Sequence, residues 1–272
     1  MADGLTRREM LRLGAGTLLA WGLWPGRLAA GASPPTTDFT FIAVNDLHFR
    51  DGHGGCTGWF ERVVAQMKAS APKAEFCLLG GDLADEGKAE QLASVREIFG
   101  KMGMPVHSVV GNHDYLDDST RAPYESLFPA QINYAFEHRG WQVLALDTTE
   151  GTKSLNTVIS PVTLGWLDER LPRLDRARPT ILVTHFPLGQ FVIGRPRNAD
   201  DLLNRCLDFN LQAVFSGHFH GFTQRTAHHA TLTTDRCCSR VRANHDGTKE
   251  KGWFVCEASA GQVSRRFVVF NA

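Results

Sequence analysis

Five polar clusters, each placed directly after an apolar run, most narrowly limit what this chain can fold into. The clearest is Gly111-Asn112-His113-Asp114, which follows the apolar residues 105–110. The other four are Asp46-Leu47-His48, Gly81-Asp82-Leu83-Ala84-Asp85, Thr184-His185 and Gly217-His218-Phe219-His220. Short apolar runs that end in turn residues predict buried strands. A single cluster is equally consistent with a capped turn, but five together predict one polar site at the carboxyl edge of a sheet.

The segments between the first three clusters predict an α/β fold. Residues 59–70 and 88–102 have the apolar spacing of helices. They alternate with the strands that we predict at residues 39–44, 76–79 and 105–110. This β-α-β-α-β order is typical of a parallel sheet with right-handed crossovers.

The second half of the chain predicts further strands and two more helices. Ser160 and Pro161 are a favourable N-cap and first residue for a helix that runs to residue 171, and residues 200–209 predict another. Residues 115–132 predict a long polar loop. Strands are predicted at residues 134–136, 143–146, 180–183 and 213–215, and a second, more antiparallel sheet at residues 223–232, 252–257 and 265–270. We therefore expect residues 33–272 to form a single domain of two sheets with outer helices.

Residues 1–32 predict an export signal. Arg7 and Arg8 precede a short, moderately apolar run at residues 13–24, and Ala30-Gly31-Ala32 supplies small residues for cleavage. Paired arginines in this position resemble the twin-arginine class of bacterial signals. The run is short for a transmembrane helix, and a monotopic anchor is the alternative. We expect export by the twin-arginine machinery, a periplasmic or secreted protein, and no stable membrane association after cleavage.

The charge balance bears on the expected partners, and the cysteine content bears on zinc sites and disulfides. Lys and Arg total 29, as do Asp and Glu, so the net charge is zero and no nucleic-acid partner is expected. None of the six cysteines forms a C-x-x-C pair, which argues against a zinc ribbon. Cys77 lies in an apolar run and is predicted to be a buried thiol. In an oxidising compartment, pairing remains open among Cys56, Cys206, Cys237, Cys238 and Cys256.

The polar clusters offer seven side chains with metal-ligand chemistry: Asp46, His48, Asp82, Asn112, His185, His218 and His220. In each of the Asp46/His48 and His218/His220 pairs the residues are two apart, so on an extended backbone they point to the same side. Carboxylate, imidazole and amide oxygen together suit Mn, Fe or Zn. Seven ligands are too many for one ion and suitable for two.

The motif order D-x-H, G-D-x-x-D, G-N-H-D, a single strand-end His and G-H-x-H resembles the calcineurin-like metallophosphoesterase superfamily over residues 39–220. The resemblance implies a two-sheet β-sandwich flanked by helices, in α-β-β-α layers. It implies one metal held by Asp46, His48, Asp82 and His220, and a second held by Asp82, Asn112, His185 and His218. His113 would act on the leaving group, oriented by Asp114.

The same resemblance implies a dinuclear-metal phosphoesterase that hydrolyses small phosphoesters with a metal-bound hydroxide, and the predicted signal at residues 1–32 makes it an exported one. The motifs are most similar to those of small cyclic-nucleotide and glycerophosphodiester phosphodiesterases, so diesters are favoured over monoesters. Asp85 is expected to contact a metal-bound histidine or a turn rather than a metal. Arg195 and Arg197 would meet a substrate phosphate or form a solvated loop pair. The alternative function is a metal-binding, non-catalytic or accessory protein on the same scaffold.

Overall fold

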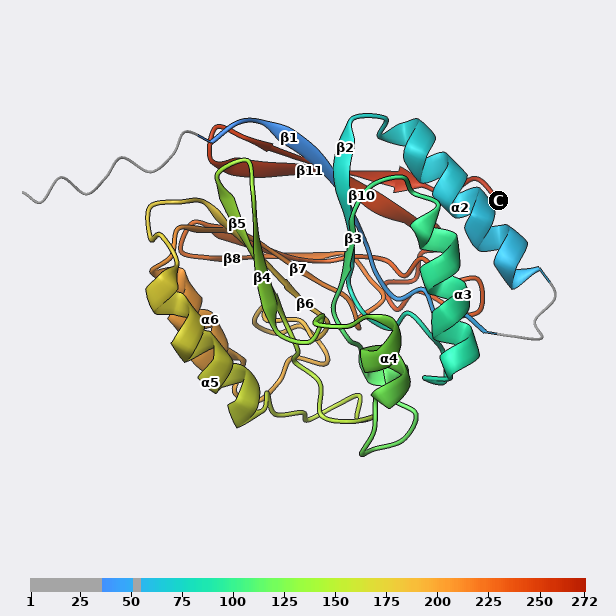
Figure 1. The fold of residues 1–272 in the computed structure, drawn as a ribbon, viewed down its shortest axis with the longest axis horizontal. Coiled ribbons are helices and arrows are strands. Elements are labelled where there is room, and N and C mark those ends of the chain that lie inside the picture. Colours follow the sequence, from blue (N-terminus) through green and yellow to red (C-terminus); the bar gives the residue numbers. More distant parts are fainter. Residues whose placement is uncertain (1–35, 51–54) are drawn as a thin grey trace, which may run out of the picture. The chain divides into compact units, whose positions relative to one another are not determined.

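The computed structural model describes residues 36–50 and 55–272, and the predicted export signal lies outside these residues. Two mixed β-sheets pack face to face with helices on their outer faces (Figure 1). Phe41 on β1 (Phe39–Val44) meets Phe215 on β7 (Leu211–Ser216) across the interface, with ring centroids 5.7 Å apart. The predicted fold class, an α/β sandwich of two sheets, is therefore confirmed.

The first sheet has the strand order β11-β10-β1-β2-β3. Its parallel part, β1-β2-β3, is the predicted β-α-β-α-β unit. The elements of this unit besides β1 are α2 (Cys56–Ser70), β2 (Ala74–Leu79), α3 (Ala89–Gly100) and β3 (Val106–Ser108). The strands β10 (Gly252–Ser259) and β11 (Gln262–Val269) complete the sheet, and β10 lies antiparallel to β1.

The second sheet has the strand order β4-β5-β6-β7-β9-β8. Its strands besides β7 are β4 (Tyr134–His138), β5 (Trp141–Leu146), β6 (Thr180–Thr184), β8 (Thr223–Ala227) and β9 (Ala230–Thr234). The helices α5 (Pro161–Arg170) and α6 (Ala199–Leu207) cover its outer face. At the start of α5, the Thr163 N–H donates to Ser160 Oγ at 3.2 Å, which confirms the predicted cap.

Two predictions about the chain path are wrong. The late strands do not form a sheet of their own: β8 and β9 extend the second sheet, whereas β10 and β11 extend the first. A run of alternating residues predicts a strand but not its neighbour, and long-range pairing decides the neighbour. The predicted loop at residues 115–132 contains a short helix, α4 (Ala122–Leu127), whose six residues are too few to show an apolar period.

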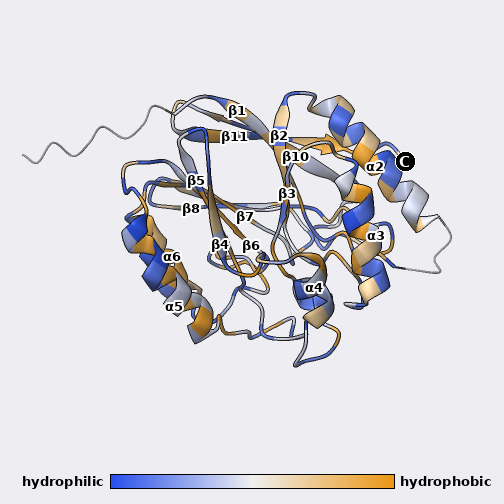
Figure 2. Cartoon of the chain, viewed as in Figure 1, coloured by the Kyte–Doolittle hydropathy of each residue, from blue (hydrophilic) through white to orange (hydrophobic). Residues whose placement is uncertain are grey.

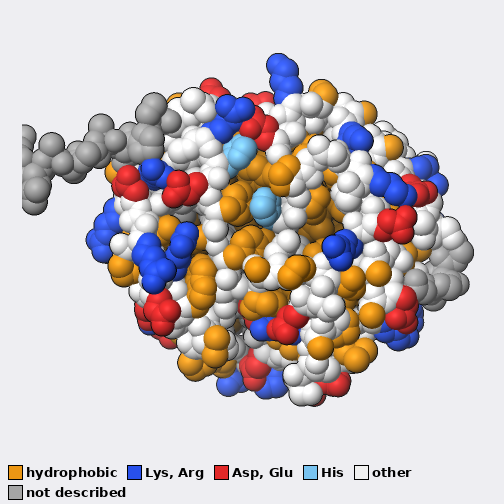
Figure 3. Space-filling model, viewed as in Figure 1, with side chains coloured by type: hydrophobic (Ala, Val, Ile, Leu, Met, Phe, Trp, Pro, Cys, Tyr) orange, Lys and Arg blue, Asp and Glu red, His pale blue; other side chains and the backbone are white. Residues whose placement is uncertain are grey.

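Apolar side chains fill three layers. One lies between the sheets, one between the first sheet and α2, α3 and α4, and one beneath α5 and α6. The outer helices carry both polar and apolar residues (Figure 2), as expected for helices with one buried side. On the face shown in Figure 3, apolar side chains occupy the middle, over the edge strands β3 and β4, and charged side chains gather toward the margin.

Cys77 is buried as predicted, and Cys206, Cys237, Cys238 and Cys256 are also buried thiols rather than halves of disulfides. Among the described residues, no helix is both long and apolar enough to span a bilayer.

Candidate metal centre

The predicted ligands meet at one end of the sandwich because each follows the carboxyl end of a strand. Asp46 and His48 follow β1, Asp82 follows β2, and Asn112 begins the short 3₁₀ turn η1 (Asn112–Asp114) after β3. From the second sheet, His185 follows β6, and His218 and His220 follow β7. The site therefore lies between the two sheets, and each sheet contributes about half of it.

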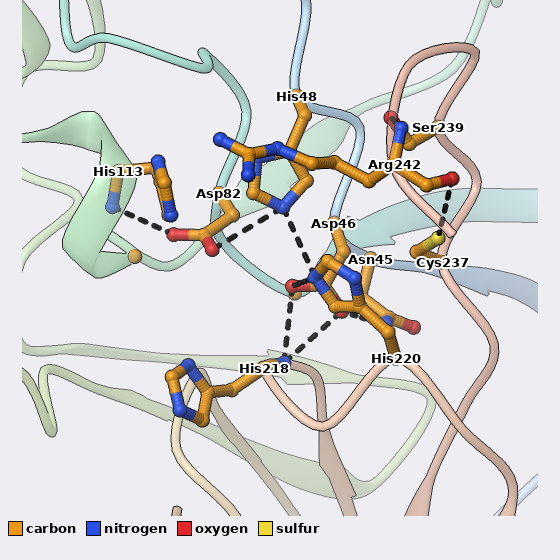
Figure 4. Close-up of polar contacts among 12 residues, drawn as sticks. Asn45, Asp46, His48, Asp82, His113, His218, His220, Cys237, Ser239 and Arg242 are labelled. Carbon is orange, nitrogen blue, oxygen red and sulfur yellow. Dashed lines mark hydrogen bonds and ion pairs between the residues drawn. The ribbon is translucent and has the colours of Figure 1, made fainter. Parts of the chain in front are cut away.

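The predicted ligands fall into two groups, in each of which the potential ligand atoms lie within 4.8 Å of one another, and a third group of this kind joins His48 to Asp85 and His113. The first group contains Asp46, His48, Asp82 and His220, and the second contains Asp82, His185 and His218. Asn112 joins the second group, since its Oδ1 lies 3.2 Å from His185 Nε2 and 3.1 Å from His218 Nδ1. Asp82 belongs to both groups, which is the arrangement that a bridging carboxylate requires. Figure 4 shows its contact with His48 of the first group.

Several of these residues have a backbone conformation that the sequence did not predict. Asp46, His48, Asp82, His218 and His220 all have positive φ, between 47° and 66°, a region that residues other than glycine rarely occupy. The prediction that each pair shares a side because its backbone is extended is therefore wrong, although both members still reach the site. Such strain persists only where surrounding contacts hold it and is concentrated at functional sites.

Main-chain hydrogen bonds between the loops supply those contacts. The Asp46 N–H donates to the Gly81 carbonyl at 3.1 Å, and the His48 N–H donates to the Asp82 carbonyl at 2.9 Å. From the other sheet, the His218 N–H donates to the Asp46 carboxylate at 3.0 Å. The loops that carry the strained residues thus fix one another.

Burial and opposite charge shape the electrostatics of the centre. Burial raises the pKa of Asp46, but the charge and hydrogen bond of His220 outweigh it and lower the pKa to about 2. Burial lowers the pKa of His220, but Asp46 outweighs it and raises the pKa to about 11. In the same way, Asp82 overcomes burial to raise the pKa of His185 to about 9. The carboxylates of Asp46 and Asp82 are therefore ionised and buried, and positive charge is needed to compensate them. This donor set fits a pair of metal cations.

Each of the four imidazoles uses its second nitrogen to contact a fixed protein acceptor. His48 Nδ1 lies 3.2 Å from Asp85 Oδ1, which confirms the predicted contact of Asp85. The other three contacts are to main-chain carbonyls: His185 Nδ1 to Gly80 at 2.9 Å, His218 Nε2 to Ser154 at 2.7 Å and His220 Nδ1 to Ala243 at 3.2 Å. Contacts of this kind fix the ring orientation and tautomer of metal-binding histidines.

His113 is held at the edge of the centre, but not by Asp114. His113 Nδ1 lies 2.9 Å from the Asp85 carbonyl, and its main-chain N–H donates to Asp82 Oδ1 at 2.8 Å. The Asp114 carboxylate instead accepts the N–H groups of Ala84 at 2.9 Å and Gly111 at 2.8 Å. Burial, together with the charge of Asp82, raises the pKa of Asp114 to about 7. The prediction that Asp114 orients the imidazole is wrong, and the residue instead joins the turns after β2 and β3.

The comparisons with known proteins agree with this geometry. The model of the family described as calcineurin-like phosphoesterase matches residues 39–222. The chain belongs to this family. Its relatives include the glycerophosphodiester phosphodiesterase GpdQ of Enterobacter lignolyticus, 24% identical over 210 residues that cover 70% of this chain and 74% of the relative. Another is the 3',5'-cyclic-nucleotide phosphodiesterase alr5338 of Nostoc sp., 24% identical over 128 residues that cover 47% of each chain.

The fold of this calcineurin-like phosphoesterase also matches solved structures. A dimetal phosphatase from Danio rerio aligns with a TM-score of 0.64 at 15% identity, covering 86% of this chain and 99% of that one. At this identity the match concerns the fold alone, and the two-sheet sandwich is common to both proteins.

In this calcineurin-like chain the centre opens into a cavity of about 450 Å³. The donors His48, Asp82, Asn112, His218 and His220 line it together with His113. The remaining lining residues are Ser154, Leu155, Ile193, Phe219, Val241, Arg242, Ala243 and His245. Arg195 is not among them: its side chain is 17% exposed, pairs with Asp200 and donates to the Leu188 carbonyl, so it is a structural loop residue rather than a solvated one.

Arg242 is a charged residue of this cavity that the sequence did not reveal. Its Nε donates to Asp85 Oδ1 at 2.8 Å and its Nη2 contacts the same oxygen, which also lies 3.2 Å from His48 Nδ1. Arg242 and His48 are both drawn in Figure 4. Asp85 also contacts Arg50, at 3.6 Å, but Arg50 does not line the cavity in the described part of the chain. Arg242 comes from the segment between β9 and β10, which carries no motif.

Proposed function

We propose that this protein is a dinuclear-metal-dependent phosphoesterase that hydrolyses small phosphodiesters in preference to phosphomonoesters. One observation carries the proposal: Asp82 lies in two groups of buried donors at once, on the floor of an open cavity. The names of the two relatives, both phosphodiesterases, support the preference for diesters.

The donors divide between two ions of Mn, Fe or Zn. Asp46, His48, Asp82 and His220 would hold one, and Asp82, Asn112, His185 and His218 the other. When bound, such a pair lowers the pKa of water toward neutrality and neutralises charge on a phosphoryl group. The protein's part is to fix the donors, which the imidazole contacts and the loop-to-loop hydrogen bonds already do.

His113 and Arg242 are the residues that we assign to the substrate. Because the Asp85 carbonyl can only accept a hydrogen bond, His113 Nδ1 carries a proton, so the ring can give a second proton from Nε2 only as the imidazolium, and a departing alkoxide oxygen would receive it. Arg242 is held by Asp85 through Nε and Nη2, which leaves Nη1 for an oxygen of the phosphoryl group. Catalysis of phosphoryl transfer depends mainly on such positioning and charge neutralisation.

We also propose that residues 1–32 direct export by the twin-arginine route. The paired Arg7 and Arg8, the short apolar run and the Ala30-Gly31-Ala32 site support this proposal. This route exports folded proteins, so the chain would bind its metals before it leaves the cytoplasm.

The test compares hydrolysis of bis(p-nitrophenyl) phosphate and p-nitrophenyl phosphate by purified protein, with added manganese and with chelator. We expect metal-dependent hydrolysis of the diester that exceeds that of the monoester, and loss of both rates with chelator. Elemental analysis of the same samples distinguishes the alternative function, a metal-binding protein without catalysis, from the phosphoesterase. Two bound metals without turnover of either ester would identify a metal-binding, non-catalytic protein and overturn the proposal.

A further inference from the structure

Exposed apolar side chains gather beside one end of the metal cavity. The described residues expose eight large apolar side chains: Leu116, Leu155, Val158, Val162, Phe191, Ile193, Phe222 and Val269. Four of these, Leu155, Val158, Phe191 and Ile193, lie on two loops that flank His218. Exposed apolar surface of this kind marks sites that bind ligands or partners.

Contacts with His218 place both loops at the cavity. His218 Nε2 lies 2.7 Å from the Ser154 carbonyl, and the next residue is Leu155. Gly194 packs so closely that a Cβ there would lie 2.3 Å from His218 Cδ2, and the preceding residue is Ile193. Leu155 and Ile193 both line the cavity, although they are 54% and 65% exposed. They form its wall at the His218 end.

Hydrogen bonds fix the two loops to each other, so their exposed apolar side chains lie on a surface of defined shape. The Arg197 N–H donates to the Thr157 carbonyl at 2.9 Å. The Asn198 side chain bonds to Ile159 twice, accepting its N–H at 2.8 Å and donating to its carbonyl at 3.0 Å. Phe191, at the outer end of the second loop, is 93% exposed and has a strained φ of 62°.

The opposite end of the cavity carries the charged Arg242, between Val241 and Ala243. Arg242 lies there beside His48 and Asp85, and the His245 ring stacks on His220 with centroids 5.1 Å apart. The cavity therefore has a charged end near the first donor group and an apolar end near the second. A ligand with a phosphoryl group over the donors would meet the two large, exposed apolar side chains of the lining, Leu155 and Ile193, on one side.

We propose that the substrate of this site carries an apolar alkyl or aryl arm on its phosphoryl group, and that this arm lies between Leu155 and Ile193. The inference rests on the proposed function, because the phosphoryl group must sit over the metal donors. Burial of apolar surface supplies the affinity: each methylene removed from water contributes about fourfold in binding.

The test measures binding rather than turnover. Manganese-loaded protein is titrated calorimetrically with methyl-, butyl- and hexylphosphonate, which cannot be hydrolysed and carry one arm of known length. We expect affinity to rise with arm length in the wild type, by up to about fourfold for each methylene that is buried. Leu155→Ser and Ile193→Ser should reduce that rise while two metals remain bound.

Val162→Ser is the matched control, because Val162 is 77% exposed on α5 and does not line the cavity. This variant should keep the wild-type dependence on arm length. Equal affinity for all three phosphonates in the wild type would overturn the inference, as would an unchanged dependence in both loop variants. Either result leaves the proposed function intact, since that is tested by hydrolysis. If affinity depended on arm length but neither ester were hydrolysed, the proposed reaction would be wrong and the apolar subsite would stand.

Discussion

Asp82 is the carboxylate, among the described residues, that both donor groups share, whereas Asp85, three positions later, belongs to neither and groups with His48 and His113. We expect Asp82→Asn to lower the metal content to one ion per chain or less and to abolish turnover, because an amide cannot bridge two cations as a carboxylate does. Asp85→Asn should retain both ions, since an amide oxygen can still accept from His48 Nδ1. Elemental analysis measures the metal content of both variants. Two ions retained in Asp82→Asn would exclude a bridging role for Asp82.

For His113, the informative comparison is between leaving groups. A nitrophenolate departs without help, whereas an alkoxide needs a proton, and general acid catalysis is typically worth about 10²–10⁴-fold. We expect His113→Ala to lose far more kcat/KM on an alkyl ester than on an aryl ester, with two metals bound. Equal losses on both esters would show that His113 only supports the turn around Gly111 or stabilises transition-state charge.

Arg242 and Arg50 make a matched pair, because both contact Asp85 and both side chains are about equally exposed, at 41% and 39%. Only Arg242 lines the cavity. We expect Arg242→Ala to weaken competitive inhibition by inorganic phosphate roughly tenfold, as loss of a charge-assisted hydrogen bond predicts, and Arg50→Ala to leave it nearly unchanged. Similar effects of the two changes would mean that Arg242 acts only through Asp85.

At the scale of residues, the candidate donors could be predicted from the order of the sequence motifs. The residues that surround the donors and the backbone conformation that positions them could not. Arg242 contacts Asp85 across 157 residues, and nothing near either residue indicates the other. The positive φ values were equally hidden, since Asp and His at these positions give no sign of the left-handed region that glycine would give. Asp114 was misassigned because its neighbour in sequence, His113, is not its partner in space.

At the scale of elements, local signals predicted helices well. The cap of α5 is one such signal, and its contribution can be measured. Ser160→Ala removes the acceptor of the Thr163 N–H and should cost about 1 kcal/mol of unfolding free energy, seen as a lower urea midpoint.

Ser94→Ala on α3 is the control. The Ser94 hydroxyl donates to the Glu90 carbonyl within an exposed part of the helix, where alanine is a better helix former. This change should leave the urea midpoint unchanged or raise it slightly. If Ser160→Ala behaved in the same way, the cap would not contribute to stability.

Strand pairing could be predicted only where the connection is short. The unit β1-α2-β2-α3-β3 follows from its alternating periods, because right-handed crossovers leave little choice of neighbour. For β10 and β11 the apolar pattern identifies strands, but either sheet could accept them. The structure assigns them to the first sheet, through the antiparallel register of β10 with β1.

For the whole molecule, the proposed export route makes a prediction about the pair Arg7 and Arg8. Replacing both with Lys keeps the positive charge and the apolar run but removes the twin-arginine signature, so the protein should accumulate in the cytoplasm. Cell fractionation gives the result. Unchanged export of the Lys variant, together with a block when the general secretory route is inhibited, would assign the signal to that route.

The position of β10 ties β1, the strand before Asp46 and His48, to a segment far from it in the sequence. β1 lies between β2, made soon after it, and β10, made much later. During translation, one hydrogen-bonding edge of β1 therefore waits for residues 252–259, whereas the turn that carries Asp46 and His48 finds its main-chain partners, Gly81 and Asp82, much earlier. A protease that removed residues 252–259 would cut near no donor, yet would leave β1 with an edge open to pairing with other chains.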